Sequence, residues 1–191
     1  MIPKKKTFIT PEEYLETERK AAFKSEYFNG EMFALAGAGK THNKISSNLI
    51  INIGAHLKNK SCQIYGSDMK VKINSSGLYA YPDISVVCGD EKFEDEESDI
   101  LLNPKLVIEI LSGSTESYDR GKKFEHYRTL ESLQEYVLVS QEKPKVEQFL
   151  KQPDSKWLYS EVNGLDSIVQ FSSIECEINL KEIYHKVEFN L

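Results

Sequence analysis

Long apolar runs are absent from this 191-residue sequence, and cysteine is scarce. No stretch approaches the ~20 consecutive apolar residues that a membrane-spanning helix needs, so we expect no membrane partner. No apolar segment follows the basic start, Met1 to Lys6, which indicates no secretory signal and predicts a cytoplasmic protein. The three cysteines, Cys62, Cys88 and Cys176, are odd in number and widely spaced. This pattern argues against a disulfide framework or a zinc site, and we expect reduced core thiols.

Repeats, linkers and low-complexity tracts are also missing, and the length suits one domain covering residues 1–191. Hydrophobic residues make up 40% and charged residues 28%, which is typical of a globular protein and not of a disordered one.

The net charge of −6 is concentrated in one short segment. Seven acidic residues and one lysine lie between Asp90 and Asp99, so the rest of the chain is formally neutral. A neutral body can carry local basic patches that contact phosphates. We expect the acidic run to be a solvated loop, since it lacks the spacing and glycine of an EF-hand.

The first half of the sequence predicts a helix, a hairpin, a second helix and several strands. Thr10 and Glu13 form a capping box for a helix that we expect to reach about Glu26, and Asn29-Gly30 marks a hairpin turn. Apolar residues spaced four apart predict a second helix with one buried stripe: Ile45, Leu49, Ile53 and Leu57. From Cys62 to Cys88, alternating residues predict an antiparallel meander.

The second half predicts a strand–helix–strand unit. A nearly continuous apolar run, 106–111, is typical of a strand covered on both faces, and a helix to about Leu130 and a strand at 136–139 follow it. Such a crossover joins parallel neighbours. The sequence also predicts two further strands, at 146–150 and 157–162, and a helical tail at 180–187. Together these elements predict an α/β (mixed α+β) fold, in which helices flank a central mixed sheet and an N-terminal helix and a hairpin precede it.

Glu109 is the most informative residue, because it stands among apolar neighbours in the predicted central strand. Burying an unpaired carboxylate costs several kcal/mol, so its side chain requires a cation or hydrogen-bond donors. A structural ion pair and a functional site both meet this requirement. Asp83 follows Pro82 at the entry to the preceding strand. Two carboxylates on adjacent strand ends suit a hard divalent cation, and the Ile110 carbonyl is a candidate third ligand.

The helix after Glu109 carries Asp119, Lys123 and Tyr127 at a spacing of four, on one face. This face predicts that Lys123 reaches the strand carboxylates. The alternative is an exposed ion pair with Asp119, worth a few tenths of a kcal/mol.

Taken in order, these segments resemble the family of putative restriction endonucleases within the PD-(D/E)XK nuclease superfamily. The resemblance covers about residues 10–187 and rests on these motifs: Ser25-Glu26-Tyr27-Phe28-Asn29-Gly30-Glu31, Ala36 to His42, Tyr81-Pro82-Asp83, Val107 to Ser112, Ser114-Thr115, Asp119/Lys123/Tyr127 and Glu135 to Val139.

The resemblance implies a restriction-endonuclease-like core and Mg²⁺-dependent (or Mn²⁺-dependent) hydrolysis of DNA phosphodiester bonds. It makes Asp83 and Glu109 the metal-binding acids and adds Glu26, expected on the first helix. The superfamily has lysine two positions after the second acid, where this sequence has Leu111. The family resemblance implies that Lys123, on the following helix, takes that role.

Ser112, Tyr127, Asp119 and His42 are candidate supporting residues around these acids, and Arg120 and Lys122 are expected to approach phosphates. The segment before His42 lacks the glycine spacing of a phosphate-binding loop. Two other functions stay open: an inactive nuclease-fold domain that binds DNA or protein, and a metal-free hydrolase using two carboxylates. We expect a homodimer, because a symmetric pair most easily cleaves both strands of a duplex.

Overall fold

A capped helix and a hairpin open the chain. In the computed structural model, which describes residues 8–189, α1 (Pro11–Glu18) has the predicted capping box between Thr10 and Glu13. The hairpin joins β1 (Ser25–Phe28) to β2 (Glu31–Ala34) through Asn29 and Gly30, both with positive φ. The basic start, residues 1–6, lies outside the described residues.

The predicted extension of the first helix to Glu26 is wrong, because Ser25 begins a strand. Tyr27 on that strand stacks on Tyr14 of α1 at a ring distance of 5.0 Å and meets Tyr79 from β5 (Leu78–Ala80) edge-on. Burial of these rings and the pairing of β1 with two strands outweigh local helix propensity.

The second helix forms as predicted. α2 (Lys40–Leu57) buries all four residues of the apolar stripe, Ile45, Leu49, Ile53 and Leu57. They pack on one face of the central sheet against Ile84, Ile108 and other alternate residues of its strands.

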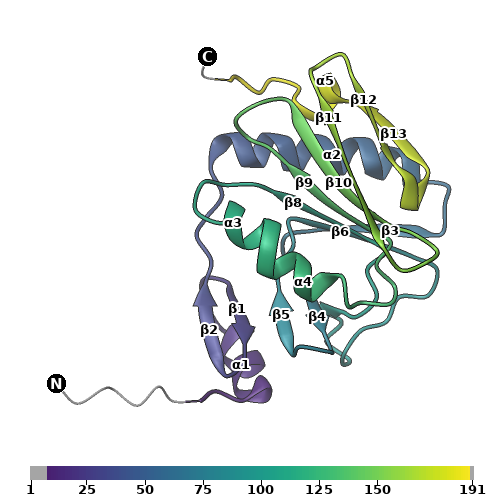
Figure 1. Cartoon of the computed structure of the whole chain (residues 1–191). Helices are drawn as coiled ribbons and strands as arrows, with labels where there is room; N and C mark the ends of the chain where they lie inside the picture. Colours follow the sequence, from purple (N-terminus) through teal and green to yellow (C-terminus); the bar gives the residue numbers. More distant parts are fainter. Residues whose placement is uncertain (1–7, 190–191) are drawn as a thin grey trace.

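The central sheet has six strands in the order β11-β10-β9-β8-β6-β3 (Figure 1). β8 and β9 are parallel, as the strand–helix–strand pattern predicts, and the other pairs are antiparallel. The bounds are β3 (Cys62–Gly66), β6 (Ile84–Cys88), β8 (Leu106–Ile110), β9 (Glu135–Val139), β10 (Lys145–Lys151) and β11 (Trp157–Asn163).

The region from Cys62 to Cys88 is not one meander. β3 pairs with β6 in the six-stranded sheet, whereas β4 (Lys70–Ile73) pairs with β5 and, in parallel, with β7 (Ile100–Leu101). These strands join the hairpin in a second sheet of order β2-β1-β5-β4-β7. The alternating pattern of the sequence identifies strands, but pairing depends on which apolar faces meet in three dimensions.

A helix crosses from β8 to β9 in three parts: α3 (Glu116–Tyr118), one π-helical turn, η1 (Asp119–Lys123), and α4 (Phe124–Tyr127). At the C-terminal end, β12 (Ile168–Phe171) pairs with β13 (Cys176–Asn179) around the 3₁₀ turn η2 (Ser172–Ile174). The predicted helical tail is only one turn, α5 (Leu180–Ile183).

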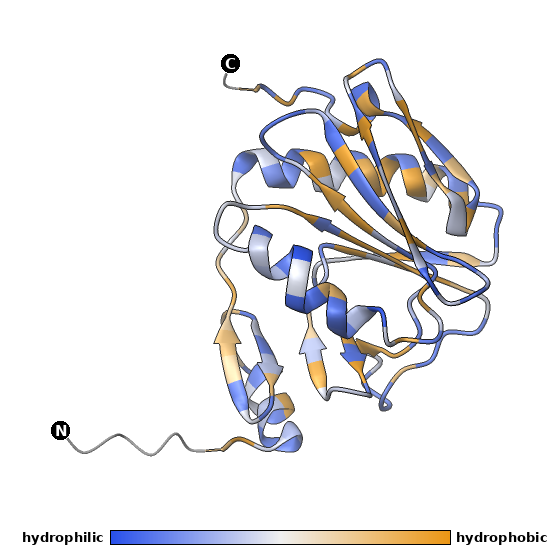
Figure 2. Ribbon diagram, viewed as in Figure 1, coloured by the Kyte–Doolittle hydropathy of each residue, from blue (hydrophilic) through white to orange (hydrophobic). Residues whose placement is uncertain are grey.

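Figure 1 shows α2 on one side of the six-stranded sheet and α3–α4 on the other. The hairpin and α1 lie at the bottom of this view, below the α3–α4 segment. The central strands β8 and β9 are largely hydrophobic, whereas β10, β11 and the α3–α4 segment carry many hydrophilic residues (Figure 2). Within residues 8–189 we find no helix both long and apolar enough to cross a membrane.

The structure corrects one further expectation. Cys62 and Cys88, directly opposite each other on β3 and β6, form a disulfide, and only Cys176 is a buried free thiol. Widely spaced cysteines become neighbours because strand pairing brings them together. The acidic run is a mostly exposed loop, as expected, and Arg19 holds it to the body at 2.7 Å from Asp95 and 2.8 Å from Asp99.

Candidate active site

The two strand carboxylates meet as predicted. Asp83 immediately precedes β6, which pairs with the Glu109 strand β8 through Ile84 and Ile108. The backbone N–H of Ile110 donates to Asp83 Oδ2 at 2.7 Å, and the N–H of Asp83 lies 3.4 Å from Glu109 Oε2. Backbone pairing of neighbouring strands therefore fixes both acids at one place on the sheet.

Lys123 lies among three carboxylates. Its Nζ is 2.9 Å from Glu109 Oε1, 3.2 Å from Glu26 Oε1 and 3.6 Å from Asp119 Oδ1, and the residue is 5% exposed. The prediction that the crossover helix brings a lysine to the strand acids is therefore confirmed in geometry. Leu111, at the position where the superfamily has lysine, is buried in the apolar core beneath this helix.

A π-helical turn carries Asp119 and Lys123. Such turns widen the helix locally and are frequent at functional sites. Here the turn leaves both charged side chains at most 5% exposed and directed toward the carboxylate strands. The sequence spacing indicates their common face, but nothing in it distinguishes a π turn from a regular α-helix.

Glu26 reaches the cluster from β1 and not from the first helix. Its Oε1 accepts a hydrogen bond of 3.2 Å from the backbone N–H of Tyr81, two residues before Asp83. The hairpin thus supplies the third carboxylate, and the hairpin signal at Asn29-Gly30 is the sequence feature that places it on a strand.

His42 contacts the same cluster from the first turn of α2. Its Nε2 is 3.1 Å from Asp83 Oδ2, whereas its Nδ1 is buried without a hydrogen-bond partner. Since Ile110 also donates to Asp83 Oδ2, this oxygen is held from two sides. His42 therefore fixes the orientation of the Asp83 carboxylate.

The other candidate residues differ in their placement. Tyr127 is fully buried, and its hydroxyl has no hydrogen-bond partner. The Ser112 hydroxyl bonds to those of Ser114 and Thr115 in the turn before α3, and not to the acids. Arg120 is held by Glu116 at 2.7 Å and Glu147 at 2.6 Å.

Tyr118 is a further neighbour of the cluster, and no motif in the sequence marks it. Lys123 Nζ lies 6.0 Å from the centre of its ring. Burial raises the pKa of its hydroxyl, and the negative charge of Glu26 raises it further. The signal available in the sequence is its position directly before Asp119 in the helix of the candidate site.

Burial and crowding of like charges perturb these carboxyl groups. Burial raises the pKa of Glu109 well above its usual value, and Asp119 and Asp83 add to this effect despite the opposing charge of Lys123. Burial also raises the pKa of Asp119. For Lys123 burial acts in the opposite direction, but the surrounding carboxylates outweigh it and hold its pKa well above the usual value, so the ammonium stays charged.

The cluster has an excess of negative charge. Glu26, Asp83, Glu109 and Asp119 are opposed by Lys123, which gives four acids against one base and a formal charge of −3 when all are ionised. Glu109 Oε1 is buried and, apart from its ion pair with Lys123, has no hydrogen-bond partner. Buried charge of this kind requires compensation by a cation or by protonation.

The donor set suits a hard divalent cation. Asp83 and Glu109 offer carboxylate oxygens, and Mg²⁺ is usually held by one or two protein carboxylates together with water. In residues 8–189, no group of three or more His, Cys, Asp or Glu side chains is arranged to hold a metal. The arrangement fits a cation with few protein ligands and not a cage formed by protein alone.

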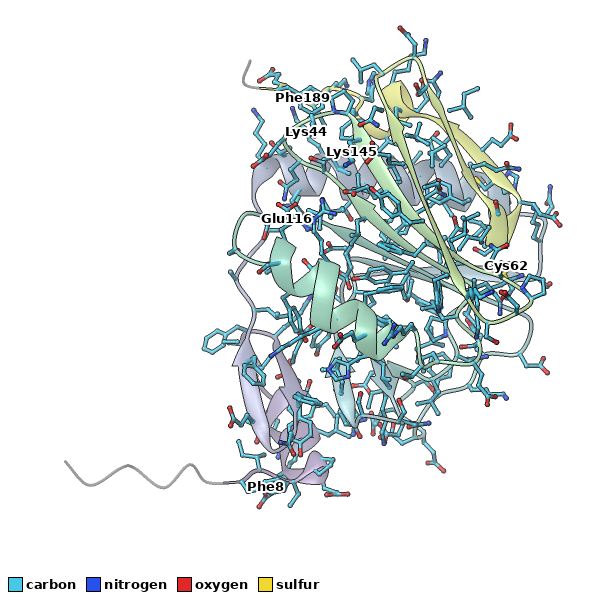
Figure 3. The ribbon with its side chains drawn as sticks, in the orientation of Figure 1. Phe8, Lys44, Cys62, Glu116, Lys145 and Phe189 are labelled. Atoms are coloured by element: carbon cyan, nitrogen blue, oxygen red, sulfur yellow. A yellow bond between two sulfur atoms is a disulfide. The ribbon has the colours of Figure 1, made fainter. Side chains whose placement is uncertain are left out.

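A cavity of about 430 Å³ lies where β8 and β9 end, and none of the carboxylates of the cluster lines it. It reaches from Gly39, the residue before α2, past Leu111 to Glu116 and Lys145, both labelled in Figure 3. A second cavity of about 580 Å³ lies at the opposite ends of these strands, beside Lys105 and Gln134.

Comparison with known proteins identifies the family of the chain. A model of the family described as "Uma2: Putative restriction endonuclease" matches residues 11–181. The uncharacterized protein sll1609 of Synechocystis sp. is 37% identical over 164 residues, covering 86% of this chain and 93% of the relative. The uncharacterized protein slr1290 of the same organism is 35% identical over 181 residues, covering 95% and 94%.

The fold matches that of a solved protein described as a putative nuclease belonging to DUF820 from Anabaena variabilis. The TM-score is 0.76 at 20% sequence identity, with 92% of this chain and 97% of the other covered. This similarity establishes that the two proteins share a fold, and the family match spans nearly the whole chain. The protein therefore belongs to the Uma2 family of putative restriction endonucleases.

Proposed function

We propose that this protein is a divalent-metal-dependent endonuclease that hydrolyses DNA phosphodiester bonds at the cluster of Asp83, Glu109, Glu26 and Lys123. The observation that carries the proposal is the charge of the cluster: three carboxylates contact a single lysine, and a fourth, Asp83, lies beside Glu109 at the start of the neighbouring strand. A divalent cation compensates this excess and suits these oxygen donors.

Asp83 and Glu109 would hold the cation, with the Ile110 carbonyl as a further candidate ligand. When bound, a divalent cation neutralises charge on phosphoryl oxygens and lowers the pKa of water. His42 and the Ile110 N–H keep Asp83 in one orientation, leaving Asp83 Oδ1 for the ligand. This preorganisation lowers the cost of assembling the site.

Lys123 acts as a fixed positive charge and not as a base. Its pKa is held well above the usual value, so it carries a proton throughout the neutral range. An ammonium at this place orients the attacking water and stabilises negative charge developing at the phosphorus. Glu26 and Asp119 hold the ammonium within reach of Glu109.

The test is cleavage of supercoiled plasmid and of short labelled duplexes with Mg²⁺ or Mn²⁺, and with chelator. We expect cleavage with metal only, and a loss of at least 100-fold in Asp83→Asn, which keeps the side-chain shape. Asp154→Asn, an exposed acid paired with Lys156, is the matched control and is expected to cleave like the wild type. Equal cleavage by wild type and Asp83→Asn would refute the assignment, and cleavage in chelator would favour a metal-free carboxylate mechanism.

A non-catalytic domain that binds DNA or protein is the alternative. The observation that favours it is the lack, in the described part of the chain, of three metal-ligating side chains arranged together. Thermal unfolding with and without 10 mM Mg²⁺ separates the two, because a ligand that binds the native state raises the midpoint. An intact site predicts an increase that disappears in Glu109→Gln; the alternative predicts none.

Cleavage of both strands would be simplest for a homodimer, with one site for each strand. Sedimentation at several protein concentrations measures the oligomeric state directly. If the protein is a monomer at all of them, the expected product is duplex DNA nicked in one strand.

A further inference from the structure

One exposed aromatic side chain lies on the same sheet face as a carboxylate of the cluster. Phe33 on β2 is 48% exposed and pairs directly with Glu26 on β1. Residues directly opposite in an antiparallel pair point to the same face, with Cβ atoms about 5 Å apart. The ring of Phe33 therefore stands next to the carboxylate that contacts Lys123.

Phe33 has no structural task that explains its place. It is absent from all three buried apolar clusters of the described residues, although its neighbours Met32 and Phe28 pack against two of them. β2 is the edge strand of its sheet (Figure 1), so no further strand covers this side. An exposed ring at the border of an active site is available for contact with substrate.

A second aromatic residue stands on the helix side of Glu26. Tyr118 is half-buried beside Lys123; burial raises the pKa of its hydroxyl, and the charge of Glu26 raises it further. Phe33 thus lies beside Glu26 on the hairpin, and Tyr118 lies beside Lys123, the partner of Glu26, on the crossover helix.

We propose that Phe33 stacks on a base of the nucleic acid next to the scissile phosphate, with Tyr118 bordering the same position. This inference rests on the proposed nuclease function and names the substrate feature that the hairpin recognises: an unpaired or splayed base. The surroundings favour this ligand over an apolar protein surface, because the partly exposed Glu31 shares the face with Phe33 and an apolar partner would have to desolvate it. A neutral base needs only the ring.

The test measures binding under conditions without turnover. A fluorescein-labelled 12-nucleotide single strand, and a duplex with a four-nucleotide overhang, are titrated with protein in Ca²⁺, after gel analysis shows no product. Stacking on one aromatic ring contributes about 1–3 kcal/mol, so Phe33→Ala should weaken binding by about 5-fold or more. Phe33→Trp should restore it, whereas Phe33→Leu should not.

Leu158→Ala is the matched control, since Leu158 is an exposed apolar residue (56%) on another edge strand, β11. Its affinity and that of the wild type should agree within 2-fold, and all variants should keep the wild-type unfolding midpoint. 2-Aminopurine placed along the overhang reports stacking directly: its fluorescence should fall on binding at one position in the wild type and not in Phe33→Ala.

The outcomes separate this inference from catalysis. Ring-dependent binding without cleavage in Mg²⁺ would support the stacking contact and refute the nuclease activity. Cleavage with equal affinity of wild type and Phe33→Ala would refute the stacking contact alone. Absence of oligonucleotide binding would overturn the stacking contact. An effect of Phe33→Ala on the sedimentation coefficient alone would also overturn it, in favour of a contact between copies of the chain.

Discussion

Replacing Lys123 by methionine tests whether this ammonium compensates the buried carboxylates. Its Nζ lies 2.9 Å from Glu109 and 3.2 Å from Glu26, and the side chain is almost fully buried. Methionine preserves most of the volume and removes the charge. Removing one partner of a buried pair costs about 3–5 kcal/mol, because the other charge stays buried without compensation.

The loss should depend on pH in a defined direction. The pKa of Glu109 is raised in the folded protein above its unfolded value of about 4.3. A carboxyl with a raised folded pKa binds more protons in the native state, so its contribution to stability falls as pH rises above about 4. Without Lys123 the folded pKa rises further. Lys123→Met should therefore lose the full amount near pH 8 and much less near pH 5.

Urea unfolding followed by circular dichroism at pH 5 and pH 8 measures this difference. With a denaturant slope of about 2 kcal/mol/M, a loss of about 4 kcal/mol moves the midpoint by about 2 M. Lys20→Met is the control, because Lys20 pairs with Glu16 in solvent and should lose no more than about 0.5 kcal/mol. Adding Glu109→Gln to Lys123→Met should recover part of the loss at pH 8.

Lys123→Met would contradict this compensation by losing less than about 1 kcal/mol at pH 8, or by losing the same amount at both pH values. Either result would mean that the carboxylates are already neutral or solvated in the wild type.

Three further predictions concern groups outside the metal-binding acids. The disulfide between Cys62 and Cys88 closes a loop of 26 residues. Because such a bond restricts the unfolded chain, Cys62→Ser should lower the free energy of unfolding by about 3–4 kcal/mol. Equal urea midpoints for this variant and the oxidised wild type would contradict the bond. Although burial raises the pKa of Asp99, hydrogen bonds from Arg19 and Lys70 lower it to about 2. That stability is present above pH 4 and lost as pH falls through 2, so Asp99→Asn should cost about 1–2 kcal/mol at pH 7 and much less at pH 2. A constant cost in pH-dependent urea unfolding would refute the pairing. Tyr127→Phe removes a buried hydroxyl that has no hydrogen-bond partner. The free energy of unfolding should therefore fall by no more than about 0.5 kcal/mol, or rise. A loss above about 1 kcal/mol in thermal unfolding would show that this hydroxyl makes a hydrogen bond in solution.

Several parts of the fold follow from local signals. The capping box before α1, the Asn29-Gly30 turn and the apolar stripe of α2 all form where the sequence predicts them. Each depends on interactions between residues a few positions apart, so the sequence contains both partners. The parallel pair β8–β9 is also predictable, because a helix between two apolar strands permits few other connections.

The candidate site was predictable to a similar degree. Glu109 is conspicuous as an acid within an apolar strand, and its strand neighbour Asp83 follows from sequential pairing. The common face of Asp119 and Lys123 follows from helical spacing, and the family resemblance adds Glu26. A single domain, a cytoplasmic location and the role of each site residue stay predictions.

Other features depend on contacts between distant segments. The sequence alone determines that a buried acid on β8 needs a cation or hydrogen-bond donors and that the following helix offers Lys123, because strand alternation and helical spacing are local. Only the tertiary structure decides that Glu26 contacts Lys123, that Cys62 faces Cys88, and that Arg19 after α1 and Lys70 on β4 pair with the acidic loop. In each case the deciding free energy comes from burial and pairing across long sequence separations, which no local pattern encodes.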